Sequence, residues 1–437
     1  MNTNTNKNLS ALIRGGQKPN GTVKVSGAKN AGTRLLAAAT ISDEIVQLNN
    51  FPTELVDVQY KVDFINKSGG KVVLDNSLDT VRIDPSGYVD SLLDNYEYPI
   101  RTTYLLVAGL IKRSGKARIP YPGGCKIGNR GYDLHIMVWK SLGAKVEEKE
   151  DYIEVTAPSG FKGGIVNFPI STIGGTENAL ISASISDNET IIKNAYISPE
   201  VESLIAFLKS MGVKIETVGN SYIKVEGAKY LRGSIFNVIP DRIEAITWII
   251  YGIISGGNIT VKDVPFEIMD IPLIHLEDAG INIYRNDKNV VVGPDCLVNG
   301  EIQPFELACG THPGIISDMQ PFYTLLGLHA DGVSRIYDYR YPERLKYCEE
   351  LNKFYNDAIE WQTGKIKTVG KSKISSATAK STDLRGSMAV VLAALMADGD
   401  SKIENVEMAL RGYNNLEKKL EGLGINIEIT ENFPEKM

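Results

Sequence analysis

Residues 210–219 read SMGVKIETVG, and closely similar phrases recur along the chain. The other copies are KSGGKVVLDN at Lys67, SLGAKVEEKE at Ser141, DAGINIYRND at Asp278 and GLGINIEITE at Gly422. In each copy an amphipathic helical stretch runs into a glycine, which suits the left-handed conformation that closes many helices, and an alternating strand follows. Each copy therefore predicts a helix, a glycine cap and a strand in that order.

The spacing of these phrases indicates one further copy. Their glycines follow one another at intervals of 74, 69, 68 and 144 residues, at Gly69, Gly143, Gly212, Gly280 and Gly424. The long last interval has room for FYNDAIEWQTGKIKTV from Phe354, in which Asn356 takes the place of the glycine. Asparagine is the next-best residue for that conformation. Repeats at a period of about 70 residues predict globular domains with internal pseudo-threefold organisation instead of an ordinary solenoid.

A second kind of phrase, rich in small and apolar residues, precedes each of these and is typical of a buried helix. The copies are SGAKNAGTRLLAAATIS, YPIRTTYLLVAGLIKRSG, IGGTENALISASISDNET, PDRIEAITWIIYGIISGG, SDMQPFYTLLGLHADG and TDLRGSMAVVLAALMADG. Strands such as EIVQLNNF, NITVKDV and SKIENV follow them. The repeating unit is thus strand, helix, strand, helix and a strand pair. Six such units in 437 residues predict two domains with three units each.

Polar residues begin these buried helices. They are Lys29 with Asn30, Arg101, Thr176 with Glu177, Asp241 with Arg242, Asp318, and Asp383 with Arg385. Taken singly, each aspartate is explained as a helix cap and each arginine as a surface residue or as the partner of an aspartate. Their recurrence at equivalent positions favours a shared anionic ligand, because helix N-termini carry unpaired N–H groups and partial positive charge.

The overall charge excludes some classes of partner. A net charge of -6 and a pI near 5.5 argue against a general nucleic-acid or membrane-surface binder, so an anionic ligand needs a local cluster of cations. The longest apolar runs, AITWIIYGII and MAVVLAALMA, are about half of what a bilayer span needs. Residues 1–10 are polar and are expected to be a disordered lead-in, and the expected location is the cytoplasm.

The stretch PYPGGCKIGNRGYDLH at residues 120–135 places a cysteine in a glycine-rich loop. Lys126 and Arg130 beside Cys125 favour its thiolate form. The four cysteines of the chain are scattered without CxxC spacing, and His135 is the single soft partner nearby, so neither a metal site nor a disulfide framework is expected. The residues alone leave open a plain turn cysteine or a functional thiol on a lid.

The chain resembles the enolpyruvyl transferases. The shared motifs stand in the family order: SGAKNA at Ser26, PGGCKIG at Pro122, DLH at Asp133, PDRIE at Pro240, SDMQ at Ser317, TDLR at Thr382 and RGY at Arg411. The similarity runs from about Gly21 to the C-terminus. SGAKNA together with the cysteine loop is specific for the branch that uses UDP-N-acetylglucosamine as acceptor. The branch that makes 5-enolpyruvylshikimate-3-phosphate shares the fold and lacks this loop.

This resemblance implies a fold, a domain division and a reaction. The fold is a two-domain inside-out α/β barrel with three βαβαββ units per domain. One domain spans residues 30–238, and the other is built from residues 11–29 plus 239–437. The reaction transfers the enolpyruvyl group of phosphoenolpyruvate to a hydroxyl of UDP-N-acetylglucosamine, with release of phosphate, in peptidoglycan precursor synthesis. No metal and no cofactor are implied, and the partners are small-molecule substrates, not nucleic acid or membrane.

The resemblance also implies roles for individual residues. Cys125 matches the acid that protonates C3 of the enol, and Asp318 matches the base near the acceptor hydroxyl. The residues matching the phosphoenolpyruvate site are Lys29, Asn30, Arg130, Arg385 and Arg411, with Lys29 and Arg411 in the catalytic set. The residues matching the acceptor site are Arg101, Arg130, Asp133, Leu134, Gly174, Asp318, Arg340 and Arg344.

Some acceptor-site positions depart from the family pattern. Gly131 and Tyr132 replace a proline and an aliphatic residue, Ile170 lies near an expected lysine, and Arg340 replaces a small apolar residue. One alternative is therefore an enolpyruvyl transferase of secondary metabolism that acts on another uridine-containing acceptor such as UMP. A catalytically silent binding paralogue is a second alternative, although the retained catalytic set argues against it. The sequence does not indicate the oligomeric state.

Overall fold

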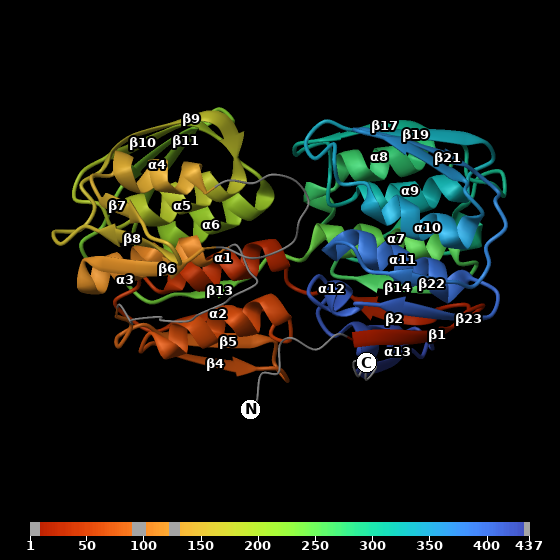
Figure 1. The fold of residues 1–437 in the computed structure, drawn as a ribbon, viewed down its shortest axis with the longest axis horizontal. Coiled ribbons are helices and arrows are strands. Elements are labelled where there is room, and N and C mark those ends of the chain that lie inside the picture. The colour runs from red at the N-terminus through yellow and green to blue at the C-terminus, as the bar shows by residue number, and fades with distance from the viewer. Residues whose placement is uncertain (1–8, 90–101, 122–131, 432–437) are drawn as a thin grey trace. The chain divides into compact units, whose positions relative to one another are not determined.

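The computed structural model describes residues 9–89, 102–121 and 132–431. They form two compact units (Figure 1). Residues 9–26 and 240–431 make up the discontinuous unit, and residues 27–89, 102–121 and 132–239 make up the inserted unit. The chain thus leaves the discontinuous unit after its second strand and returns at Pro240. These boundaries lie within three residues of those that the resemblance implied.

Among the described residues, the inserted unit contains three sheets. Their strand orders are β13(Ile235–Asn237)-β3(Val46–Asn49)-β5(Thr80–Asp84)-β4(Lys71–Asp75), β6(Lys116–Pro120)-β8(Tyr152–Thr156)-β7(Lys145–Glu148), and β11(Lys214–Val218)-β12(Tyr222–Glu226)-β10(Thr190–Ala195)-β9(Gly164–Thr172). The helices are α1(Lys29–Ala39), α2(Val56–Lys67), η1(Thr102–Leu106), α3(Val107–Ser114), α4(Asp133–Ser141), α5(Ile173–Ala183) and α6(Pro199–Ser210).

The described part of the discontinuous unit also contains three sheets. Their orders are β22(Thr378–Lys380)-β23(Asp400–Glu404)-β1(Leu9–Arg14)-β24(Glu428–Glu431), β15(Tyr284–Arg285)-β16(Val290–Val292)-β14(Asn258–Lys262)-β2(Asn20–Lys24), and β18(Ile315–Ile316)-β17(Glu306–Gly310)-β19(Val333–Asp338)-β21(Lys365–Val369)-β20(Ile359–Gln362). The helices are α7(Arg242–Ile254), α8(Asp270–Asp278), α9(Gln320–Leu328), α10(Lys346–Tyr355), α11(Leu384–Met396), α12(Glu407–Leu410) and α13(Leu416–Gly422), with the short η2(Phe266–Ile268) and η3(Pro294–Cys296).

The chain crossing follows from an exchange of strands between repeats. β2 precedes α1, yet it pairs in parallel with β14 of the discontinuous unit. β13 precedes α7, yet it pairs in parallel with β3 of the inserted unit. β1 completes a third sheet by lying antiparallel between β23 and β24. Each unit therefore depends on strands that are distant in sequence.

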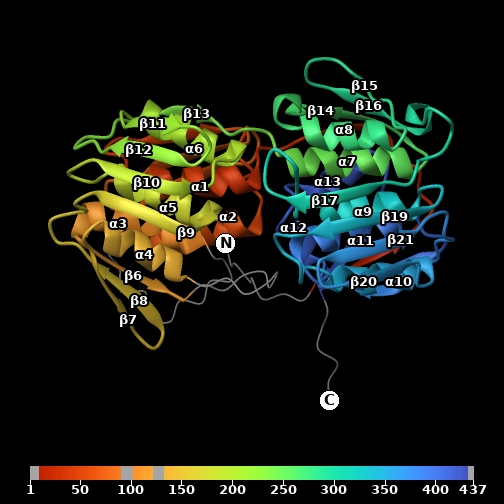
Figure 2. The same cartoon turned by 90° about the horizontal axis from the view of Figure 1, so that it is seen from above.

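The predicted buried helices and glycine caps are confirmed. In α7 every residue from Arg242 to Ile253 is buried, and α11 is buried from Arg385 to Leu395. The repeat glycines have φ angles of 89°, 88°, 110°, 77° and 72° at Gly69, Gly143, Gly212, Gly280 and Gly424. Asn356 ends α10 in the left-handed conformation with φ 51°. The sheets flank the buried helices within each unit, as the inside-out barrel requires (Figures 1 and 2).

The disordered lead-in predicted for residues 1–10 extends two residues too far, because β1 begins at Leu9. Leu9 and Ser10 already belong to β1, where Leu9 lies opposite Glu431 and Ser10 lies opposite Glu404. Ala11 and Ile13 are buried on one face of this strand. Their burial fixes the strand in the sheet, and the pairing continues back to Leu9. Residues 1–8 lie outside the described residues. Within the described ranges, no helix combines the length and the apolar character that a bilayer crossing requires.

Candidate active site

The start of α1 brings two of the predicted phosphoenolpyruvate residues to one helix end. Lys29 is the first residue of α1, and its side chain is 8% exposed. Its Nζ lies 2.8 Å from Oδ2 of Asp57 in α2. Asn30 follows and is half-buried, with its Oδ1 3.5 Å from Nη1 of Arg34. A cation and an amide therefore stand together at the amino end of a buried helix.

Three predicted acceptor residues come together around His135 in the inserted unit. Asp133 and Leu134 form the first turn of α4, directly before His135. The His135 ring stacks on Tyr104 with centroids 4.3 Å apart. A Cβ atom at Gly174 would lie 3.4 Å from Cε1 of His135, so the start of α5 touches the first turn of α4. The His135 ring is therefore packed between Tyr104 and the start of α5.

Other predicted residues cannot be placed. Arg101, Cys125 and Arg130 lie outside the described residues, as do Lys126 and Gly131. Their roles remain predictions from the resemblance.

In the discontinuous unit, Arg344 connects two carboxylates. Its Nη1 lies 2.6 Å from Oδ1 of Asp318, and its Nη2 lies 2.6 Å from Oδ1 of Asp383. Arg344 is 4% exposed. Burial by itself would lower the pKa of the Arg344 guanidinium, but Asp383 and Asp318 outweigh burial and raise that pKa. Asp318 is thereby held by a permanent cation while its side chain remains 27% exposed.

Asp338, which the sequence did not single out, organises the surroundings of Asp318. It ends β19 and is 1% exposed. Ser317 donates from Oγ to its Oδ1 at 2.9 Å, and Gln320 donates from Nε2 to its Oδ2 at 2.9 Å. The backbone N–H groups of Arg340 and Tyr341 also donate to Oδ1, at 2.9 and 2.8 Å. One buried carboxylate therefore ties the Arg340 loop to the segment that carries Asp318.

Arg385 connects to the segment that carries Arg411. Its side chain is 3% exposed, its Nη1 donates to Gly412 O at 3.0 Å, and its guanidinium lies 5.0 Å from the centroid of the Tyr413 ring. Its Nη2 lies 3.4 Å from Oδ2 of Asp241. Burial would lower the pKa of Arg385, but Asp241, Tyr413 and Asp318 together outweigh burial and raise that pKa. The predicted phosphoenolpyruvate residues Arg385 and Arg411 are therefore brought together through Gly412.

The predicted capping role of two aspartates is confirmed. Asp241 accepts from the N–H groups of Ile243 and Glu244 at the start of α7. Asp383 accepts from those of Arg385 and Gly386 at the start of α11. Asp318 differs from them, because the N-cap of α9 is Met319. Asp241 and Asp383 therefore each cap a helix and bind an arginine, whereas Asp318 binds an arginine without capping a helix.

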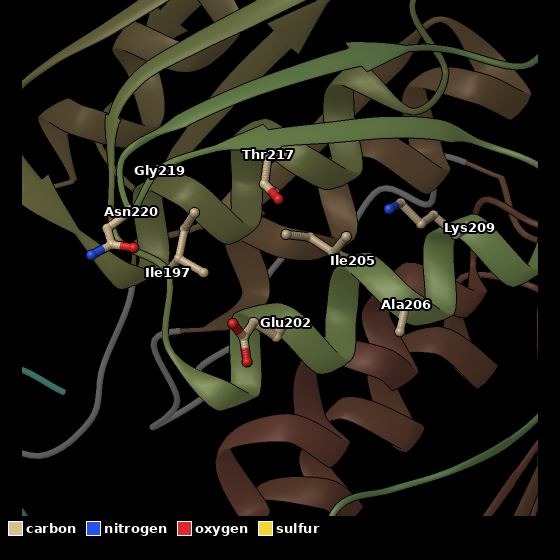
Figure 3. Close-up of a pocket in the computed structure, with 8 residues that line it drawn as sticks. All are labelled: Ile197, Glu202, Ile205, Ala206, Lys209, Thr217, Gly219 and Asn220. Carbon is tan, nitrogen blue, oxygen red and sulfur yellow. The ribbon is translucent and has the colours of Figure 1, made fainter. Parts of the chain in front are cut away.

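A surface hollow of about 280 Å³ in the inserted unit lies elsewhere (Figure 3). Its lining residues are Ile197, Glu202, Ile205, Ala206, Lys209, Thr217, Gly219 and Asn220, and none of them is a predicted site residue. Over the ranges that the structure describes, no group of three or more His, Cys, Asp or Glu side chains is arranged to hold a metal ion.

Comparison with known proteins identifies the relatives of this chain. The profile of the EPSP synthase (3-phosphoshikimate 1-carboxyvinyltransferase) family matches residues 13–420. The UDP-N-acetylglucosamine 1-carboxyvinyltransferase of Geotalea uraniireducens is 36% identical over 95% of this chain and 98% of its own length. The protein of the same name from Koribacter versatilis is 35% identical over 97% of this chain and 98% of its own length.

Solved structures share the fold. The enolpyruvyl transferase NikO from Streptomyces tendae superposes with a TM-score of 0.85 at 22% identity, covering 98% of this chain and all of its own. EPSP synthase from Acinetobacter baumannii gives a TM-score of 0.75 at 15% identity, covering 97% of this chain and all of its own. These likenesses confirm the two-domain enolpyruvyl transferase fold that the repeats and motifs predicted.

Proposed function

Because the chain belongs to the EPSP synthase (3-phosphoshikimate 1-carboxyvinyltransferase) family, we propose that it transfers the enolpyruvyl group of phosphoenolpyruvate to a hydroxyl of UDP-N-acetylglucosamine. The observation that carries the choice of acceptor is similarity over nearly the whole chain to several proteins named UDP-N-acetylglucosamine 1-carboxyvinyltransferase. The proposed product enters peptidoglycan precursor synthesis in the cytoplasm. Phosphate is the second product.

In this proposal the reaction proceeds by addition and elimination. The acceptor hydroxyl loses its proton to Asp318 as its oxygen bonds to C2 of phosphoenolpyruvate, and Cys125 delivers a proton to C3. The resulting tetrahedral ketal then returns a proton from C3 to the Cys125 thiolate and expels phosphate, which takes up the proton left on Asp318, and the double bond is restored. Acceptor and phosphoenolpyruvate are thereby converted into the enolpyruvyl ether and phosphate without gain or loss of electrons.

The described side chains support separate roles for two sets of residues, one for phosphoenolpyruvate and one for the acceptor. Lys29, Asn30 and Arg411, with Arg130, would bind the phosphate and carboxylate of phosphoenolpyruvate. Arg385 would support this group by holding Gly412 beside Arg411. Charge-assisted hydrogen bonds of this kind stabilise a transition state in which negative charge shifts to the leaving phosphate.

On the acceptor side, Asp133, Leu134, Gly174 and Arg340, with Arg101 and Arg130, would contact the nucleotide sugar. Arg344 would act in this site by holding Asp318, to which its guanidinium is bonded. Because a buried partner already holds this base in one orientation, the base loses no further rotamer freedom when the acceptor hydroxyl binds.

A phosphate-release assay tests this function. The protein is incubated with phosphoenolpyruvate and either UDP-N-acetylglucosamine or UMP, and the products are identified by mass spectrometry. We expect phosphate release and an enolpyruvyl ether with UDP-N-acetylglucosamine. Release with UMP alone would replace the acceptor in the proposal, and release with neither nucleotide would contradict it.

A further inference from the structure

The position of Lys29 requires a compensating charge. Lys29 is the first residue of α1, where both the helix dipole and the loss of water oppose an ammonium group. Ala28 at the N-cap carries no polar side chain, and the first turn of α1 contains no acidic residue. The stabilising carboxylate must therefore come from another element.

Asp57 supplies that carboxylate from the first turn of α2. Its Oδ2 lies 2.8 Å from Nζ of Lys29, and its side chain is 13% exposed. An acidic residue in a first turn is favoured by the dipole of its own helix, so Asp57 lies where α2 stabilises it as an anion. The pair is thus a short, largely buried, charge-assisted hydrogen bond.

A second contact fixes α2 against α1. Lys61, one turn further along α2, is fully buried, and its Nζ donates to Thr33 O at 2.7 Å. Thr33 lies one turn after Lys29. Two side chains of α2 therefore hold successive turns of α1, and the distance between Asp57 and Lys29 is determined by helix packing (Figure 1).

The neighbouring charges are of the wrong sign or are otherwise engaged. Glu177 of α5 accepts from Nε of Arg34 with both oxygens, at 3.0 and 3.1 Å. Arg34 is itself a cation, and burial lowers the pKa of Lys61 well below its usual range, so neither side chain can balance the charge of Lys29. Among the described residues, Asp57 supplies a carboxylate that contacts the Lys29 ammonium directly, at 2.8 Å.

We propose that Asp57 is a positioning residue that holds the Lys29 ammonium in place for phosphoenolpyruvate. This inference rests on the proposed function, in which Lys29 binds that substrate. A lysine side chain otherwise loses considerable rotamer freedom when it binds an anion, and Asp57 removes that loss beforehand. An ammonium has three N–H donors, so a carboxylate that accepts from one does not prevent a phosphate from accepting from another.

The test uses Asp57→Asn, Asp57→Glu and a matched control, Asp63→Asn. Asp63 lies on the same helix and pairs at 3.0 Å with Lys67, whose side chain is 56% exposed. We expect Asp57→Asn to raise KM for phosphoenolpyruvate about 10- to 100-fold, the range for a hydrogen bond to a charged group. The kcat should fall less than KM rises, Asp57→Glu should recover part of the loss, and Asp63→Asn should stay within about twofold of wild type.

A second measurement does not depend on turnover. Pyridoxal phosphate followed by borohydride labels lysines through their unprotonated amines, and mass spectrometry reports the extent at Lys29. Removing the adjacent anion should raise labelling of Lys29 in Asp57→Asn about tenfold at pH 8, and Asp57→Glu should restore part of the protection. If Asp57→Asn does not fold, the comparison of Asp57→Glu with wild type tests the positioning role. We then expect a smaller increase in both the KM for phosphoenolpyruvate and the labelling of Lys29.

The outcomes separate this inference from the proposed function. Wild-type protein without phosphate release on any acceptor contradicts the proposed function, whereas labelling of Lys29 still reports on Asp57. Unchanged KM for phosphoenolpyruvate and unchanged Lys29 labelling in folded Asp57 variants would overturn the positioning role. A loss of kcat with no change in KM or labelling would also overturn it, because it would make Asp57 a structural residue alone.

Discussion

Replacing Arg344 by leucine should destabilise the discontinuous unit strongly. The substitution leaves the carboxylate of Asp383, which is 5% exposed, without the guanidinium 2.6 Å away, and it also releases Asp318. Removing one partner of a buried ion pair costs about 3–5 kcal/mol, because the other charge stays buried. For a unit of this size, 1 kcal/mol corresponds to about 2–4 °C in Tm. We therefore expect Tm of the Arg344→Leu protein to fall by about 10 °C.

The chain offers a matched control for this substitution. Arg340 lies on the same segment, is partly exposed, and has its guanidinium 5.9 Å from the centroid of the Tyr341 ring. Loss of a solvent-accessible cation of this kind costs at most about 1 kcal/mol. Urea unfolding and calorimetry at pH 7.5 measure both variants. Equal stabilities of Arg344→Leu and Arg340→Leu would refute the role of the buried ion pairs.

A double-mutant cycle isolates the charge from the packing. Asp383→Asn keeps an oxygen for the α11 N-cap, since asparagine also caps helices well, but it removes the anion that Arg344 balances. Combining it with Arg344→Leu should recover about 1–3 kcal/mol relative to the sum of the single variants. Additivity of the two substitutions would contradict the electrostatic origin of the effect. Turnover of Arg344→Leu, assayed below its melting range, should fall at least about tenfold if Asp318 is the base that Arg344 holds.

Further predictions concern the thiols and a buried histidine. Cys125→Ser should strongly reduce turnover and leave acceptor binding largely intact, as measured by phosphate release and calorimetric titration; unchanged turnover would remove Cys125 from the mechanism. Alkylating agents should modify Cys125, faster with acceptor bound, and spare Cys296, Cys309 and Cys348, which are buried. Burial also raises the pKa of the Cys348 thiol to about 12 and raises the pKa of the Cys309 thiol well above its usual range. Peptide mapping that places the label on one of those three would count against the site. Burial lowers the pKa of His329 to about 4 from its ordinary 6.5. Between pH 4 and pH 6.5 the imidazole is therefore protonated in the unfolded chain and neutral in the folded chain. The contribution of neutral His329 to the free energy of unfolding should therefore be fully present above pH 6.5. It should decline by at most on the order of 3 kcal/mol as the pH falls to 4. The His329→Gln protein should lack this part of the decline in urea unfolding, and an identical pH profile would exclude His329 as its source.

The repeats were predictable because their signals are local. A glycine in the left-handed conformation closes a helix within a few residues of the apolar pattern that defines it, so Gly212 and even Asn356 could be assigned from neighbouring residues. The exchange of β2 and β13 between repeats was not predictable in this way. Strands with the same alternating pattern pair equally well with several partners. The choice depends on packing across 185 residues of intervening chain for β3 and β13, and across 233 for β2 and β14. The domain crossing therefore came from the family resemblance alone.

The partners of the site residues were harder to predict than the residues themselves. Lys29, Asp318 and Arg385 belong to motifs, but Asp57 and Asp338 are single acidic residues in ordinary contexts. Asp57 is 28 positions from Lys29 and meets it only because α2 packs on α1. Asp338 is an acid at a strand end, which is also where surface acids are common, and its burial beside Ser317 and Gln320 gives it its function. Contacts between elements define these residues, and no local pattern contains that information.

The buried arginines refine the prediction that helix starts collect positive charge for an anionic ligand. In the discontinuous unit, Arg344 and Arg385 are bonded to Asp318, Asp383 and Asp241, so three carboxylates of the protein itself more than balance the two cations. Such a group offers little net attraction to a substrate anion, but it holds Asp318 and the segment of Arg411 in fixed orientations. The same holds for Lys29, which Asp57 pairs in the inserted unit. Within each unit, a cation at a helix start is therefore paired with a carboxylate of the same unit, and under the proposed function its contribution to binding is a geometry prepared before the substrate arrives.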